Sequence, residues 1–215
     1  MQEILNKIKK FIPKKIFTFF QPVYHYLMIL IGAIIYRFPS KNIYIVGITG
    51  TKGKSTTVEI MNSIFEAAGY KTALSNTIRF KIGDESKANK YKMSMPGRFF
   101  MQKFLREAVD NDCTHAVIEI TSEGSKQFRH KFIDLDAFIF TNLSAEHIEA
   151  HGSYEKYREA KLNIADNLDN KSKKNTILVA NGDDIESELF LEKKADKKLT
   201  FSLSDAKPFN TDDKG

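Results

Sequence analysis

The sequence predicts an α/β fold with a doubly wound, mostly parallel sheet, preceded by an N-terminal apolar helical segment. From residue 42 onward, short β-branched apolar runs alternate with helical patterns, as in proteins whose parallel strands are connected by helices. A glycine-rich turn lies between the first strand and the first helix of this pattern. In α/β proteins this turn is where phosphate groups bind.

The first strand, helix and strand are the clearest part of the pattern. The run NIYIVGI at 42–48 is continuously apolar, as expected for a strand buried on both faces. A helix follows over 55–68, because its apolar residues recur at spacings of three and four and Gly69 ends it. The run KTALS at 71–75 is the next short strand.

The rest of the chain continues the alternation. Residues 77–95 are arranged around a polar Gly-Asp-Glu-Ser turn and predict an extended hairpin. A helix is expected to open at Pro96, because proline fits the first helical position. The further helices are expected over 96–109, 153–168 and 183–191, and the further strands over 115–120, 136–143, 175–180 and 198–203.

Residues 1–40 are expected to be separate from a domain over 41–215. They have a basic start and an apolar run from Val23 to Tyr36, shorter than the roughly 20 residues that span a bilayer. Extending the run back to Ile16 reaches that length but includes Pro22 and polar residues. We expect a helix that docks on the domain or makes peripheral contact with a membrane surface, rather than a span or a cleaved signal peptide.

Charge and cysteine content limit the classes of partner. The net charge is +6 with a pI near 9.2, which permits anionic partners. The lysines are not interleaved with aromatic residues as in a nucleic-acid platform, so we expect no nucleic-acid partner. The single cysteine, Cys113, excludes an internal disulfide and a zinc cluster and suits a reducing cytosol. We expect a cytoplasmic protein, with any contact to the inner membrane surface made through 1–40.

The glycine-rich turn is GITGTKGKSTT, residues 47–57. It departs from the pattern G-x-x-x-x-G-K-[ST], because an isoleucine stands where the first glycine belongs. Gly50 and Gly53 nevertheless allow backbone N–H groups to turn inward. Lys54 can reach the β- and γ-phosphates, and the Ser55 hydroxyl can hold Mg²⁺ at the positive end of the helix. An ordinary glycine-rich turn is the alternative, but it would not require Lys-Ser at the start of a helix.

This turn resembles the G-T-x-G-K-[ST]-T loop of the Mur ligase family, the ATP-dependent amide ligases of peptidoglycan and polyglutamate synthesis. Three further stretches resemble motifs of its UDP-N-acetylmuramoyl-tripeptide synthetases, in the same order. They are AVIEITSEGSKQFR (116–129), FTNLSAEHIEAHGSYEKYREAK (140–161) and VANGDD (179–184). The resemblance covers about residues 43–184 and implies a Mur ligase central domain of P-loop type.

The resemblance also implies roles for individual residues, with ATP and Mg²⁺ as cofactors. Glu119 and His147 would bind Mg²⁺ together with Ser55. From the residues alone, Glu119 could instead be an ion-pair partner or helix cap, and His147 an ordinary surface residue. Lys161 alone would be a solvated lysine, but the family's lysine at this position is carbamylated by CO₂. The implied ATP-binding residues are Gly50, Thr51, Lys52, Gly53, Lys54, Ser55, Thr56 and Asn181.

The implied reaction has two steps, with Lys54 and Lys161 as the catalytic residues. A substrate carboxylate attacks the γ-phosphorus to give an acyl phosphate, while Mg²⁺ and Lys54 neutralise the triphosphate. The amine of a free amino acid then displaces phosphate and forms an amide. The implied acceptor is a UDP-N-acetylmuramoyl dipeptide. Arg129 suits an anionic group, although a surface cation is an equal alternative. The implied substrate-binding residues are Ser94, Ser122, Gln127 and Arg129.

Three positions depart from the subfamily pattern. Its T-T-P is Ser-Met-Pro at 94–96, its S-S-H histidine is Glu123, and the aspartate before His147 is Glu146. These changes affect the identity of the acceptor more than the use of ATP. We expect residues 1–215 to lack the family's uridine-binding N-terminal domain and the C-terminal domain that binds the amino acid, so that they would be a fragment of a ligase and inactive alone. We therefore expect the ATP-binding core of a ligase. The two alternatives are a polyglutamate-type amide ligase and an ATP-binding module without complete ligase activity.

Overall fold

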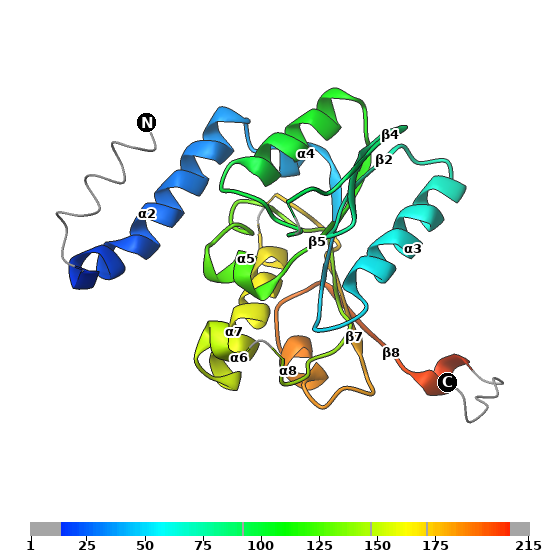
Figure 1. The fold of residues 1–215 in the computed structure, drawn as a ribbon. Helices are drawn as coiled ribbons and strands as arrows, with labels where there is room; N and C mark the ends of the chain where they lie inside the picture. Colours follow the sequence, from blue (N-terminus) through cyan, green and yellow to red (C-terminus); the bar gives the residue numbers. More distant parts are fainter. Residues whose placement is uncertain (1–13, 92, 147, 171, 207–215) are drawn as a thin grey trace.

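The computed structural model (Figure 1) describes residues 14–91, 93–146, 148–170 and 172–206. The strands are β1 Tyr44–Thr49, β2 Thr72–Ser75, β3 Arg79–Ile82, β4 Glu85–Ala88, β5 His115–Glu119, β6 Ala137–Phe140, β7 Ile177–Asn181 and β8 Lys197–Phe201. The helices are α2 Lys14–Ile35, α3 Lys54–Ala67, α4 Phe100–Asp110, α5 Ser122–Lys126, α6 Ile148–His151, α7 Tyr154–Ala165 and α8 Ser187–Leu191. Short 3₁₀ turns lie at Pro39–Asn42, Asp166–Leu168 and Leu203–Ala206.

The strands form one sheet in the order β4-β3-β2-β5-β1-β6-β7-β8. All pairs from β2 to β8 along this order are parallel, and β3 and β4 extend one edge as an antiparallel hairpin. The predicted hairpin over 77–95 is therefore present. Since β1 lies between β5 and β6, the carboxyl ends of these three strands lie together at one edge of the sheet.

Helices cover both faces of the sheet, with α3 on one side and α4, α5 and α7 on the other (Figure 1). Successive residues of β1 point to opposite faces, which is why this strand is apolar throughout. The face toward α3 is packed by Val46, Ile48, Val58, Leu74 and Val117. The opposite core includes Ile45, Leu105, Ile118, Phe138 and Ile164. The predicted doubly wound α/β fold is confirmed.

Three predicted helices differ in their boundaries, and one of them, expected over 183–191, begins only at Ser187. The helix expected from Pro96 begins only at Phe100, because Gly97 has a φ of 70°, a left-handed conformation that a continuing helix excludes. The helix expected over 153–168 ends its α-helical part at Ala165 and closes with a 3₁₀ turn. The side chain of Ser153 caps its start by accepting a hydrogen bond from the Lys156 amide.

Helix α2 lies alongside the domain, next to α4 (Figure 1). Its inner face buries His25, Ile29 and Ala33 at spacings of four. Gly32 lies so close to Phe99 that an added Cβ would be 2.6 Å from the Phe99 ring. Its outer face is exposed and apolar. No helix in the described part of the chain combines the length and apolarity needed to cross a bilayer.

Candidate active site

The candidate site lies at the carboxyl edge of the sheet, where the loop after β1 meets residues that follow β5 and β6. The register pairs Ile48 of β1 with Glu119, the last residue of β5. Thr141 follows β6 directly, and its amide donates to the Thr49 carbonyl at 3.0 Å. Ligand sites of open α/β sheets form at this edge, where neighbouring connections diverge to opposite sides.

Gly50 is required by a close approach of two segments. A Cβ at this position would lie 1.9 Å from Thr141 Oγ1, and the residue has a φ of 155°. Any side chain here would push the loop away from the end of β6. This contact accounts for the unusual glycine spacing of the loop, because the glycine is needed where the chain passes Thr141.

Asn142 holds the tip of the loop in place. Its Oδ1 accepts hydrogen bonds from the amides of Thr51 and Lys52, at 3.2 and 2.9 Å, and its Nδ2 donates to the Lys52 carbonyl at 3.1 Å. Thr141 Oγ1 donates to the same carbonyl at 2.9 Å. Neither Thr141 nor Asn142 was predicted from the sequence to have a role, although both belong to the T-N-L part of the motif at 140–161.

Lys54 begins α3 and folds back over the loop. Gly53 precedes it as the N-cap, with a φ of 77°, and Lys54 Nζ donates to the Thr51 carbonyl at 2.9 Å. Burial lowers the pKa of Lys54, while Glu119 and Glu146 act in the opposite direction. Thr56 is exposed in the first turn of the helix. The loop therefore combines a cation with the positive end of a helix, an arrangement suited to phosphate.

Glu119 is a buried carboxylate, 2% exposed. Its hydrogen bonds come from neutral groups: the Ser55 hydroxyl at 2.6 Å, and the Thr77 hydroxyl and amide at 3.1 and 3.3 Å. In the described part of the chain no cation contacts it directly, although Lys54 and Lys161 attract it through space. A buried carboxylate needs a compensating charge.

The pair Glu119 and Ser55 fits the predicted Mg²⁺ site. Both offer the oxygen ligands that this ion prefers, and only a few protein ligands are needed because Mg²⁺ keeps several waters. The third predicted ligand, His147, lies outside the described residues. Among the residues that are described, no group of three or more His, Cys, Asp and Glu side chains is arranged to hold a metal ion.

Lys161 of α7 is 2% exposed, so the alternative of a solvated lysine is wrong. Its Nζ donates to the Gly50 carbonyl at 2.6 Å and lies 4.9 Å from the centroid of the Tyr157 ring. Tyr157 in turn hydrogen bonds to Thr51 Oγ1 at 3.0 Å. Burial, reinforced by Lys54 and opposed by Glu119, lowers the pKa of Lys161 to about 7.

Three of the four predicted substrate-binding residues lie together. Arg129 donates to Gln127 Oε1 at 2.6 Å and to the carbonyl of Met95, the residue next to Ser94. Ser94 Oγ is buried without a hydrogen-bond partner in the described structure. Ser94 lies before α4, and Gln127 and Arg129 follow α5. The sequence did not predict that these two segments lie side by side.

Ser122 and Asn181 occupy other parts of the site. Ser122 Oγ lies 3.1 Å from Nε2 of the buried His151. Asn181 ends β7, and its Nδ2 donates to the Thr141 carbonyl at 2.9 Å. His151 was not predicted to be a site residue, because the sequence of a turn does not show whether its histidine is buried.

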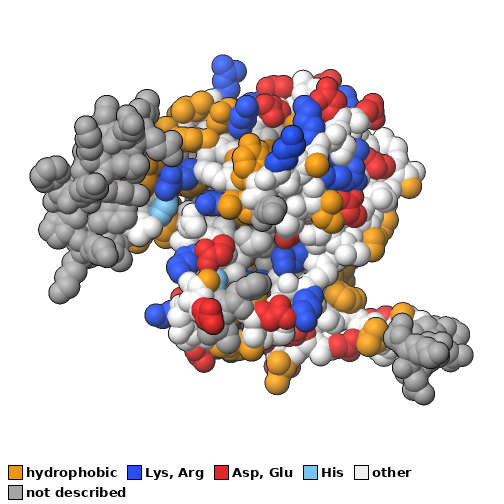
Figure 2. Space-filling model, in the orientation of Figure 1, with side chains coloured by type: hydrophobic (Ala, Val, Ile, Leu, Met, Phe, Trp, Pro, Cys, Tyr) orange, Lys and Arg blue, Asp and Glu red, His pale blue; other side chains and the backbone are white. Residues whose placement is uncertain are grey.

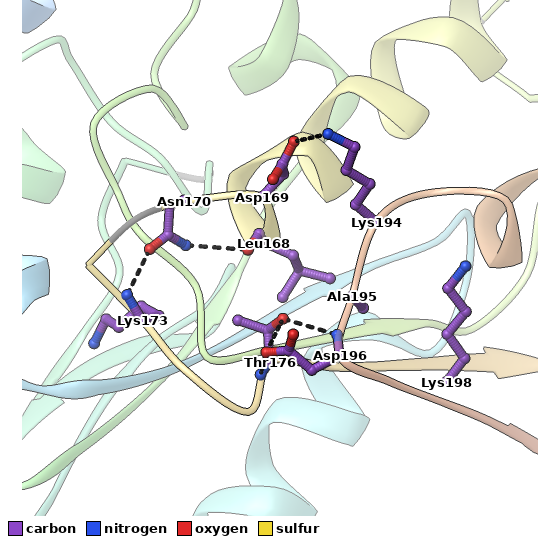
Figure 3. A pocket seen from close by; sticks show the side chains of 9 residues that line it. All are labelled: Leu168, Asp169, Asn170, Lys173, Thr176, Lys194, Ala195, Asp196 and Lys198. Atoms are coloured by element: carbon purple, nitrogen blue, oxygen red, sulfur yellow. Dashed lines mark hydrogen bonds and ion pairs between the residues drawn. The ribbon is translucent and has the colours of Figure 1, made fainter.

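A separate pocket of about 340 Å³ lies at the opposite edge of the sheet (Figure 3). Its polar groups already pair with one another: Lys194 with Asp169 at 2.9 Å, and the Thr176 amide with Asp196 at 2.8 Å. Thr176 directly precedes β7, so this pocket faces the amino ends of the strands. It has no part in the site at the carboxyl edge.

A sequence profile of the Mur ligase middle domain matches residues 48–214. The chain belongs to the Mur ligase family. The family and the fold predicted from the four motifs are thereby confirmed, and the loop, Glu119 and Lys161 lie within the matched range.

Named relatives of this Mur ligase domain are longer proteins. The UDP-N-acetylmuramoyl-L-alanyl-D-glutamate--2,6-diaminopimelate ligase of Chlamydia caviae is 33% identical over 168 residues, covering 78% of this chain and 34% of its own. The UDP-N-acetylmuramyl-tripeptide synthetase of Roseiflexus sp. is 34% identical over 170 residues, covering 75% and 33%. The chain thus spans about a third of the length of these curated relatives.

Solved structures agree with the family assignment. A UDP-N-acetylmuramoyl-L-alanyl-D-glutamate--2,6-diaminopimelate ligase superposes with a TM-score of 0.65 and 26% identity, covering 80% of this chain and 33% of that one. A folylpolyglutamate synthase of Mycobacterium tuberculosis, complexed with ADP and AMPPCP, has a TM-score of 0.65 at 14% identity, covering 82% and 46%. At that identity the second likeness shows the shared fold alone.

Proposed function

We propose that this Mur ligase domain is the ATP-binding core of an amide ligase of peptidoglycan precursor synthesis. The enzyme would add a free amino acid to a UDP-N-acetylmuramoyl dipeptide. The observation that carries the proposal is the convergence of Lys54, Lys161 and the Ser55–Glu119 pair on one loop. Two lysines and a buried carboxylate in contact with a phosphate-type loop are unnecessary for folding and suit phosphoryl transfer.

The residues of the chain have distinct roles in this reaction. The backbone at Gly53 and the start of α3 would hold the phosphates, with Lys54 neutralising their charge. Ser55 and Glu119 would hold Mg²⁺, which when bound supplies positive charge next to the transferred phosphoryl group. Arg129 and its neighbours would orient the acceptor so that its carboxylate faces the γ-phosphorus. Lys161, carbamylated, would add a negative ligand beside Gly50.

Trapping the acyl phosphate tests the proposed reaction. The protein purified from its own cells is incubated with ATP, Mg²⁺, UDP-N-acetylmuramoyl dipeptide and hydroxylamine. We expect ATP-dependent formation of the acceptor hydroxamate, detected by mass spectrometry, because hydroxylamine intercepts an activated carboxyl group. Omission of ATP is the control.

Two other outcomes would replace the proposal. A hydroxamate formed only with folate or another glutamate acceptor would identify a polyglutamate-type ligase, the function named for the structural neighbour. ATP binding without a hydroxamate from any carboxylate would identify an ATP-binding module.

We also propose that the protein acts in the cytoplasm and contacts anionic membrane surfaces through residues 1–40. The outer face of α2 is apolar, and basic residues precede it in the sequence. This combination is typical of helices that lie in the headgroup region. Its exposed apolar residues are Phe20, Val23, Leu27, Ile31, Ile34 and Ile35.

Sedimentation with vesicles tests the membrane contact. We expect the protein to sediment with anionic phosphatidylglycerol vesicles and Leu27→Asp to reduce the bound fraction by about five-fold or more, because a charge would enter the apolar layer. Ile185→Asp, at a residue 92% exposed on the domain, is the matched control and should bind as the wild type does. Equal binding of both variants would contradict the proposal.

A further inference from the structure

Helix α2 contributes a side chain, His25, next to the residues proposed to bind the acceptor. Arg98, in the turn before α4, donates from Nε to His25 Nδ1 of α2 at 3.0 Å. Its guanidinium lies 4.9 Å from the centroid of the Tyr24 ring, also on α2. Lys and Arg side chains gather beside a histidine on this face of the molecule (Figure 2).

Arg98 and Arg129 lie near each other, because Arg129 donates to the carbonyl of Met95, three residues before Arg98. In agreement with this placement, burial and then the two arginines lower the pKa of His25, and burial and then Arg98 lower the pKa of Arg129. The attraction of Glu123 for Arg129 is weaker than both effects. Two guanidinium groups held near each other at a partly buried position destabilise one another unless an anion lies between or beside them.

Neither arginine has an acidic partner in the described part of the chain. No ion pair of the described residues includes Arg98 or Arg129. Among the described residues, the hydrogen bonds of Arg129 go to neutral oxygen and sulfur atoms, and its buried Nε has no hydrogen-bond partner there. Ser94 Oγ, in the same region, is a second buried group without a hydrogen-bond partner in the part of the chain that is described. These groups leave positive charge and hydrogen-bonding capacity available for a ligand.

His25 fixes the direction of the Arg98 guanidinium. The ring is buried, and burial together with the two arginines lowers the pKa of His25, so the imidazole is neutral at pH 7. A neutral ring can accept the Arg98 hydrogen bond at Nδ1. With Nε bound to His25, the two terminal nitrogens of Arg98 remain as a planar fork, the geometry that binds carboxylate or phosphate oxygens in pairs.

We propose that Arg98 and Arg129 together bind an anionic group of the acceptor substrate, with His25 of α2 as a positioning residue. The inference rests on the proposed function, which already assigns Arg129, Ser94 and Gln127 to the acceptor. It adds Arg98 as a binding residue, and α2 then lines one side of the acceptor site. The anionic group is a carboxylate or a phosphate, since the fork binds either.

The test measures acceptor affinity by calorimetry, with a non-hydrolysable ATP analogue present. We expect Arg98→Gln to weaken the binding of UDP-N-acetylmuramoyl dipeptide by about ten-fold or more, since charge-assisted hydrogen bonds are lost. The affinity for the ATP analogue should not change. Arg37→Gln is the matched control, because Arg37 is exposed in the turn after α2, about three helical turns from His25 along the chain, and this variant should bind the acceptor as the wild type does.

Variants at His25 separate positioning from folding. His25→Asn keeps an acceptor near the position of Nδ1 and should retain most of the affinity, while His25→Leu should lose about three-fold or more. A purely structural role would lower the melting temperature and the affinity for the ATP analogue as well. If Arg98→Gln fails to fold, Arg98→Lys keeps the charge without the fork and should show an intermediate loss.

Uridine diphosphate and muramoyl dipeptide without the nucleotide are titrated in parallel. The one whose affinity depends on Arg98 identifies the group bound as phosphate or carboxylate. Equal acceptor affinity in Arg98→Gln and Arg37→Gln would overturn the inference and leave the proposed function intact. Failure of the wild type to bind any of these acceptors while binding the ATP analogue would overturn both.

Discussion

Replacing Lys54 by alanine is expected to abolish ATP binding, with a loss of affinity of about 100-fold or more. The reason is geometric and electrostatic. Lys54 Nζ lies 2.9 Å from the Thr51 carbonyl at the tip of the loop, where it supplies a positive charge to the phosphates that the backbone N–H groups cannot replace. The measurement is a titration of the isolated chain with ATP and Mg²⁺ by calorimetry.

Lys87→Ala is the control for the loss of Lys54. Lys87 lies on β4, at the edge of the sheet and three strands away from β5, and its side chain is 80% exposed, where it pairs with Glu85 at 3.1 Å. We expect its removal to change the affinity for ATP by no more than about three-fold, because exposed ion pairs contribute little and the phosphate loop is retained. If Lys54→Ala binds ATP as tightly as Lys87→Ala, the assignment of the phosphate loop is wrong.

Replacing Lys161 by methionine is expected to lower the ligase activity by about 100-fold or more and to eliminate carbamate formation. Reaction with CO₂ needs a neutral amine. With a pKa of about 7, about half of Lys161 is neutral at pH 7, against on the order of one in a thousand for an ordinary lysine. The measurement is ¹³C NMR of the protein in ¹³C-bicarbonate, where the wild type should show a carbamate signal that Lys161→Met lacks.

Lys156→Met, on the exposed face of the same helix, is the control and should keep both the signal and the activity. A carbamate signal that persists in Lys161→Met would show that another lysine reacts. Full activity of Lys161→Met would show that Lys161 has no catalytic role.

The same substitution should change how stability depends on pH. The folded pKa of Lys161 lies below its unfolded value, so the unfolded chain binds the proton first as the pH falls through the range from 10.5 to about 7. Unfolding therefore takes up a proton, and the contribution of Lys161 to the free energy of unfolding increases as the pH rises from about 7. In urea titrations, the free energy of unfolding of the wild type should therefore increase relative to that of Lys161→Met as the pH is raised from 7 to 9.

The order of strands and helices could be predicted because the parallel strands are buried on both faces and so are apolar throughout. The loop could be predicted for a related reason, since its glycines and Lys54 lie between two recognisable elements. Short elements were missed: α5 and α6 span five and four residues, too few for a helical period to show. The start of α4 was misplaced because a left-handed glycine, Gly97, is not distinguishable from other glycines in a sequence.

The site was only partly predictable, since its contacts join residues far apart in the chain. Periodicity indicates that a lysine lies on a helix, but not that α7 turns Lys161 toward the Gly50 carbonyl. Asn142 and His151 likewise act through partners, Lys52 and Ser122, that no local pattern connects to them. Family motifs pointed to Lys161, whereas the contacts of Arg98 with His25 appear only once α2 is placed.

The hydrogen bonds from Asn142 and Thr141 to the loop affect how a nucleotide would bind. A glycine-rich loop that moved freely would lose conformational entropy on binding, and this loss would subtract from the affinity. Here the amides of Thr51 and Lys52 are already fixed to the segment after β6. The loop acquires its shape when the sheet forms. Its conformational entropy is therefore lost on folding, and little of that loss is subtracted from the affinity for a nucleotide.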